Sequence, residues 1–323
     1  MKNALKIFFI LALIGLFSTL FFIPIGTQES DAIEKTKIVT TIFPAYDFTR
    51  ELSADTNADI KILIKPGTDI HSYDPTPQDI ASIKEADIFV YNGGKSEEWV
   101  NKILNELNKD DTVIVRMMDS VDLKEEDDSN IIEKESKKDE AEPDYDEHIW
   151  TSPKNVKLIA NNIAQALINH TPSNTSIIQH NLENYKANLD TLDSNFRQLA
   201  KDKTGTLIVA DRFPFKYFID EYGFDYVSAF PGCSEQTEAS TKTIAELIKK
   251  VEQNPQKIIF NLELSNTKIT QTIAKSTGAK VLTWHSVHNV SQQDFDSGKT
   301  YLDFMRDNLA NLGEALHDQP ANK

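Results

Sequence analysis

The chain has 323 residues, of which 40% are hydrophobic and 26% are charged, and a chain of this length normally forms two globular units with ample core. Its formal net charge of −16 at pH 7 argues against a nucleic-acid partner, because the phosphates would be repelled, and is compatible with cation binding. The single cysteine, Cys233, excludes an internal disulfide, so the core must stabilise the fold.

The N-terminus has the pattern of an export signal. An apolar run at residues 7–25 follows Lys2 and Lys6, and this charge order leaves the positive end in the cytoplasm and the body outside. The run is about as long as a membrane-spanning helix, roughly 20 residues, and the cleavage signal after it is poor. We expect residues 1–33 to be an uncleaved membrane anchor, with a cleaved signal peptide and a secreted or periplasmic protein as the alternative.

Residues 34–173 are predicted to form an N-terminal α/β lobe. Apolar segments that are typical of buried strands alternate with segments of helical periodicity. The strands are expected at residues 37–42, 60–64, 87–91 and 112–116, and the helices at 46–54, 76–86 and 154–169. This alternation predicts a mostly parallel sheet that is flanked by helices.

Within this lobe, residues 119–147 form an acidic loop, with fourteen acidic residues and four lysines. So little apolar content predicts a mobile segment. Two interpretations stay open: the loop collects cations near a binding site, or it is simply a solvated insertion.

A long helix and a second lobe follow. Residues 174–202 have apolar residues at spacings of three and four and no internal Gly or Pro, which predicts one linker helix. Residues 203–323 are predicted to be a C-terminal α/β lobe. Its strands are expected at 206–210, 225–229, 257–261 and 280–283, and its helices at 215–222, 240–253 and 268–277. The fold class is therefore α/β, with two lobes joined by one long helix and a ligand in the cleft between them.

Four of the seven histidines are candidate metal ligands, because imidazole together with a carboxylate is a usual donor set for zinc. His71 follows the second predicted strand in a loop that two prolines stiffen, and His148 precedes Trp150 and Pro153. The other candidates are His285 and His288. The remaining histidines have helical or terminal polar surroundings and are expected to be solvated: His170, His180 and His317.

Two motifs point to a family. Residues 66–77 read P-G-T-D-I-H-S-Y-D-P-T-P, and H-I-W-T-S-P begins at His148. With the two-lobed layout, they resemble the zinc and manganese cluster of ABC-transporter solute-binding proteins, over roughly residues 36–315. The resemblance implies a monomeric binding protein that takes up zinc, or manganese next, and delivers it to an ABC permease in the cytoplasmic membrane. It implies no enzymatic activity and no catalytic cofactor.

The same resemblance implies His71 and His148 as two ligands and places the third and fourth at Asp211 and His285. The family has His or Glu at the third position. Asp211 therefore either binds the metal or pairs with Arg212 or a backbone amide. The family has Asp at the fourth position.

Two further residues are less certain ligands. His288 either replaces His285 as a ligand or contacts a ligand without binding the metal itself. Glu263 either completes the site or caps the next helix.

Two other functions stay open, a zinc-dependent hydrolase and a surface adhesin stabilised by a metal. An open coordination position for water would favour the hydrolase. Nucleotide binding is excluded, because Phe89 stands where a phosphate-binding loop ending in Gly94-Lys95-Ser96 needs its first glycine.

Overall fold

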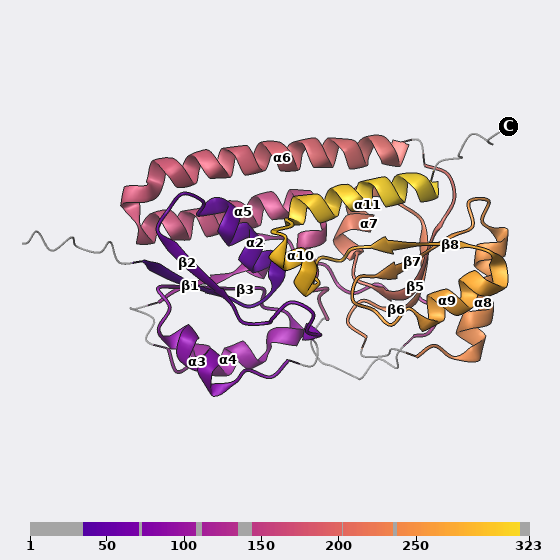
Figure 1. Cartoon of the computed structure of the whole chain (residues 1–323), viewed down its shortest axis with the longest axis horizontal. Helices are drawn as coiled ribbons and strands as arrows, with labels where there is room; N and C mark the ends of the chain where they lie inside the picture. The colour runs from indigo at the N-terminus through magenta and orange to yellow at the C-terminus, as the bar shows by residue number, and fades with distance from the viewer. Residues whose placement is uncertain are drawn as a thin grey trace, which may run out of the picture. The chain divides into compact units, whose positions relative to one another are not determined.

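The computed structural model describes residues 35–70, 73–107, 112–134, 144–201, 203–234 and 238–316. Residues Lys35–Lys323 belong to one compact unit. It contains two four-stranded parallel sheets that are flanked by helices and a long helix, α6, as the sequence predicts (Figure 1). The expected fold class is confirmed.

The first sheet has the strand order β2-β1-β3-β4, and all its pairs are parallel. Alternate residues face opposite sides: Ile38 and Ile88 pack into the main core, whereas Val39 and Phe89 pack under α3 and α4. The elements are β1 (Thr36–Thr40), α2 (Phe43–Leu52), β2 (Ala58–Ile62), α3 (Pro77–Lys84), β3 (Ile88–Tyr91), α4 (Trp99–Leu104) and β4 (Val113–Arg116).

The second sheet repeats this design with the order β6-β5-β7-β8. Leu207 and Phe260 face the main core, whereas Ile208 and Ile259 pack under α8 and α9. The elements are β5 (Leu207–Phe213), α7 (Lys216–Tyr222), β6 (Tyr226–Pro231), α8 (Thr241–Gln253), β7 (Ile258–Leu262), α9 (Lys268–Thr277) and β8 (Lys280–Trp284).

Helices α5 (Pro153–His170) and α6 (Thr175–Lys201) connect the two sheets in sequence. Helix α6 contacts α2 and α5 beside the first sheet, and α7 and α11 beside the second. The buried side of α6 includes Leu189 and Phe196, which join one continuous apolar core with residues of both lobes. The lobes are therefore packed together along this helix as well as joined by it.

Among the described residues, three α-helices were not predicted from the sequence: α4, α10 (Gln292–Asp296) and α11 (Tyr301–Leu316). Helix α11 returns along α6 (Figure 1) and buries Phe304 and Leu312. Strand β5 also runs three residues past its predicted end, so Asp211 lies inside the strand.

The described part of the acidic segment is packed rather than free, which differs from the expected mobile loop. Residues Glu125 and Tyr145 form an antiparallel bridge, and Ile131, which is buried, forms a parallel bridge with Ser228 of β6. The side chain of Glu133 accepts hydrogen bonds from Ser240 N and Thr243 Oγ1 at the start of α8. The insertion therefore contacts the second lobe.

The expected N-terminal anchor, residues 1–33 with the apolar run at 7–25, lies outside the described residues. Among the helices that the structure describes, none is both long and apolar enough to cross a membrane.

The start of α11 is tied to the first lobe by Asp47 of α2. This side chain is fully buried; one oxygen accepts a hydrogen bond from Tyr301 N at 2.8 Å, and the other lies 2.5 Å from Arg50 Nη2. Burial raises the pKa of Asp47 to about 7, against the effect of Arg50. The carboxyl group therefore joins two helices that are far apart in the chain.

We expect Asp47→Ala to lower the free energy of unfolding by roughly 3 kcal/mol, because it leaves the buried Tyr301 N–H and Arg50 without their acceptor. Denaturant titration followed by circular dichroism measures this. Asp59→Ala, on an exposed position of β2, is the matched control and should change stability by no more than about 0.5 kcal/mol. Equal effects of the two substitutions would contradict the role given to Asp47.

Candidate metal site

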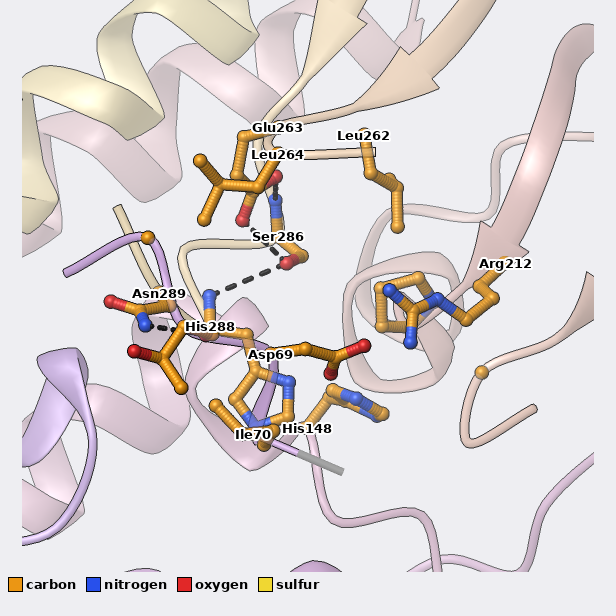
Figure 2. Close-up of a pocket in the computed structure, with 14 residues that line it drawn as sticks. Asp69, Ile70, His148, Arg212, Leu262, Glu263, Leu264, Ser286, His288 and Asn289 are labelled. Carbon is orange, nitrogen blue, oxygen red and sulfur yellow. Dashed lines mark hydrogen bonds between the residues drawn. The ribbon is translucent and has the colours of Figure 1, made fainter. Parts of the chain in front are cut away.

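A cavity of about 110 Å³ lies among loops that follow the carboxyl ends of strands in both sheets (Figure 2). This is where parallel α/β sheets usually bind ligands. The lining residues come from the loop after β2, from the segment at His148, and from the ends of four strands of the second sheet. They are Gly67, Thr68, Asp69, Ile70, His148, Arg212, Pro214, Gly232, Leu262, Glu263, Leu264, Ser286, His288 and Asn289.

His148 is held in a fixed orientation. It lies just before the short 3-10 helix Ile149–Thr151 and is only 1% exposed. Its Nδ1 lies 3.1 Å from Asp146 Oδ1, which also accepts a hydrogen bond from the His148 backbone N–H. Burial lowers the pKa of His148, but the charge of Asp146, together with Glu147 and Glu126, outweighs burial and raises the pKa above its ordinary value. Because Nδ1 is engaged, Nε2 is the nitrogen left for a ligand.

Three donor groups converge beside the cavity. Among the residues that the structure describes, a ligand atom from each of Glu147, His148 and His288 lies within 4.8 Å of the others. The rings of His148 and His288 are 5.0 Å apart at 82°, and both lie against Trp150. Two imidazoles and a carboxylate suit a four-coordinate zinc ion and leave room for one more ligand.

Glu147 is positioned by the loop after β3. Its carboxylate accepts hydrogen bonds from Ser96 N and Ser96 Oγ, and its carbonyl accepts one from Asn92 Nδ2. A Cβ added at Gly94 would meet Glu147 Oε2 at 2.1 Å, so this loop needs glycine for the close approach. The first lobe thus fixes the carboxylate.

The second lobe fixes His288. The loop after β8 is attached to the loop after β2, because Asn289 Nδ2 donates to the carbonyls of Lys65 and Thr68, and Gly67 N donates to Val290 O. Trp150 Nε1 donates to Ser286 O at 2.8 Å. These contacts hold both histidine-bearing segments together.

The predicted ligands occupy different places. His148 lies in the cluster, and His71 lies outside the described residues, although its neighbour Ile70 lines the cavity. Asp211 lies outside the cluster: its carboxylate accepts hydrogen bonds from Arg212 N and Leu262 N. His288, expected as an alternative or supporting residue, joins His148.

His285 points elsewhere. It lines a neighbouring cavity with Asp294 and Phe304, and its Nδ1 is buried without a hydrogen-bond partner among the described residues. Burial, with the charge of Lys299, lowers the pKa of His285 to about 4. It is therefore a neutral imidazole next to the site.

Glu263 lies between the two cavities and lines both. Its carboxylate accepts hydrogen bonds from Ser286 N and Ser286 Oγ, at 2.7 and 2.6 Å. Burial raises its pKa to about 7. The carboxylate thus holds the loop that carries His288.

Sequence reasoning did not find Glu147, Asp146 or Arg212. Asp146 and Glu147 directly precede His148, and this adjacency is the one indication in the sequence that they lie beside a ligand. No local pattern distinguishes them from the other acidic residues of the segment before them.

Glu97 is another buried carboxylic acid, and it lies near Glu147. It is 2% exposed, and its Oε2 accepts a hydrogen bond from Gly93 N. Burial raises its pKa to about 7, and the hydrogen bond from Gly93 N opposes this only in part. Near neutral pH this residue therefore exchanges a proton.

We expect Glu97→Gln to stabilise the metal-stripped protein relative to wild type as the pH rises from about 5 to 8, by roughly 3 kcal/mol at most. The folded wild type retains the Glu97 proton where the unfolded chain has lost it, so its stability falls through this pH range. Urea titrations at several pH values measure the difference. Glu98→Gln, at the exposed neighbouring position, should show no such trend, and a parallel trend in both variants would contradict the assignment.

Comparison with known proteins identifies the family. The family profile described as "Zinc-uptake complex component A periplasmic" matches residues 38–315. The high-affinity zinc uptake system protein ZnuA of Bacillus subtilis (strain 168) is 30% identical over 291 residues, which cover 90% of each chain.

Two solved structures share the fold. The metal-dependent lipoprotein YcdH of Bacillus subtilis superposes with a TM-score of 0.74 and 30% identity, over 88% of this chain and 100% of that one. The Zn(II)-bound ZnuA-like domain of Streptococcus pneumoniae AdcA gives 0.72 and 26%, over 87% and 99%. The chain therefore belongs to the family of periplasmic zinc-uptake complex component A proteins.

Proposed function

We propose that this protein is the extracytoplasmic solute-binding component of an ABC importer, and that its cargo is a divalent transition metal, zinc in preference to manganese. The observation that carries the proposal is the convergence of Glu147, His148 and His288 beside a cavity that residues of both lobes line. A donor set rich in imidazole suits zinc better than manganese, which favours oxygen. The names of the relatives, which are zinc-uptake and zinc-binding proteins, support the same cargo.

Each donor has a separate role in this proposal. His148 presents Nε2, because Asp146 engages Nδ1. His288 faces it from the second lobe, and Glu147 supplies the negative charge from its fixed place beside Ser96. His71 is our candidate for the fourth position. Asp211, with both oxygens on backbone amides, is assigned to the structure of β5 and β7 instead.

The connection between the lobes bears on how metal binding is signalled. The lobes share one apolar core and a set of hydrogen bonds at residues 65–68 and 286–290. Large closure would break these contacts, so we propose that the metal acts by ordering the loops around the cavity. The protein would then present this state, as a monomer, to a permease in the cytoplasmic membrane. Residues 1–33 would tether it to the outer face of that membrane.

The chain should bind one zinc ion tightly, and His148→Ala and His288→Ala should each weaken binding at least about 100-fold, because each removes one of few donors. Competition titration against a zinc-binding dye measures this, with manganese run alongside. His285→Ala and the exposed His180→Ala are controls that should retain the affinity of wild type. Loss of binding in His285→Ala but not in His288→Ala would contradict the site as assigned.

Asp146→Asn should weaken zinc binding by about 10- to 100-fold, the usual effect of losing the carboxylate behind a metal-binding histidine. The amide keeps an acceptor for the His148 N–H but loses the negative charge that makes the imidazole more basic. Asp144→Asn, two residues earlier and exposed, is the matched control. Unchanged affinity in Asp146→Asn would show that Asp146 does not support the ligand.

A further inference from the structure

Arg212 brings a positive charge into a cavity that is proposed to bind a cation. It lies near the end of β5 and lines the cavity with His148 and His288, and its side chain is directed into the cavity (Figure 2). The strand has an irregular register between Val209 and Arg212. The Asp211 carboxylate fixes this bend by accepting hydrogen bonds from Arg212 N and Leu262 N. The local backbone therefore positions the guanidinium group.

The guanidinium group differs from those of the other arginines. Arg50, Arg116, Arg197 and Arg306 each form an ion pair with a carboxylate. In the described part of the chain, the guanidinium group of Arg212 makes neither an ion pair nor a hydrogen bond. Asp69, an acidic residue that lines the same cavity, already takes part in another interaction.

A guanidinium group does not act as a metal ligand here, because it keeps its proton at any relevant pH and has no acceptor. A zinc ion in the same cavity would repel it, because like charges repel each other more strongly beside a protein surface than in bulk water. An anion placed between the zinc ion and the guanidinium group would offset the repulsion between them. Carboxylate-type oxyanions fit best, because the planar guanidinium fork matches two oxygens.

We propose that the cavity takes zinc together with a small carboxylate-type oxyanion, which binds the metal as a fifth ligand in addition to the three clustered donors and His71, and which accepts hydrogen bonds from Arg212. A four-coordinate zinc site can expand to five ligands, so the anion does not need to displace a protein donor. A cavity of about 110 Å³ has room for several water molecules and hence for a small anion. This inference rests on the proposed function and names the form in which the metal is bound. Bicarbonate and a small organic acid share this chemistry.

Zinc titrations of the full-length protein at buffered free zinc test the proposal in three media: free of carbon dioxide and carboxylates, with added bicarbonate, and with added acetate. Wild type should bind zinc at least about tenfold more tightly in one of the two anion media, the effect of a charge-assisted bidentate pair. The medium that responds identifies the anion. Arg212→Gln should lose this response, and Arg212→Lys should retain only part of it, because it keeps the charge without the fork. Arg306→Gln, which removes an exposed arginine, should respond like wild type.

A ¹³C NMR spectrum of the labelled anion gives an independent readout. A bound signal should appear with zinc and wild type, and should be absent with Arg212→Gln. Zinc affinity that is equal in all three media, or an anion response that persists in Arg212→Gln, would overturn the inference and leave zinc binding itself intact. Tighter zinc binding by Arg212→Gln without any anion response would overturn it too, and would make Arg212 a purely repulsive charge. Absence of zinc binding in every medium would overturn the proposed function as well.

Discussion

The position of the site depends on one short segment, residues 146–150, which is buried between the lobes and receives hydrogen bonds from both. Asn92 of the first lobe donates to Glu147 O, and Tyr217 of the second donates to Asp146 O. Trp150, which is fully buried, donates to Ser286 O and accepts from Tyr301 OH. A buried segment must have its polar groups satisfied, and here the partners come from distant parts of the chain. Both histidines of the cluster lie against this tryptophan, so the donor geometry exists only when the two lobes are packed together.

Most of the fold was predictable because its strands are short apolar runs and its long helices have clear periodicity. The eight strands and helix α6 lie within a few residues of their expected bounds. Helix α11 was missed, and its start depends on Asp47, a residue 254 positions earlier in the chain. The acidic segment was expected to be mobile because its composition is polar. The described part of the segment is instead held by pairing of Ile131 with Ser228, and composition carries no information about such a contact.

The site was predictable only as far as local motifs extend. His148 stands in a motif and lies in the cluster, whereas the choice between His285 and His288 depends on backbone conformation. Val287, between them, has a φ of 60°, which is unusual for a β-branched residue, and this turn sends the two imidazoles to different cavities. In the same way the irregular register of β5 decides that Arg212 lines the cavity. A sequence motif predicts neither the left-handed backbone at Val287 nor the irregular register of β5. The positions of His288 and Arg212 therefore required the three-dimensional structure.

The pairing of the acidic segment with β6 also has a consequence for solubility. In the second sheet β6 is one of the two edge strands, and an edge strand with free backbone groups is a template for pairing with another chain. Here Ile132 N and Glu133 N donate to Ser228 O and Ala229 O, and Ser228 N donates to Asn130 O. These backbone groups of β6 are thus already hydrogen-bonded within the molecule. The segment that occupies them has neighbouring residues with mostly negative charge. A second molecule that approaches this edge meets electrostatic repulsion instead of open hydrogen-bonding positions, which disfavours edge-to-edge aggregation.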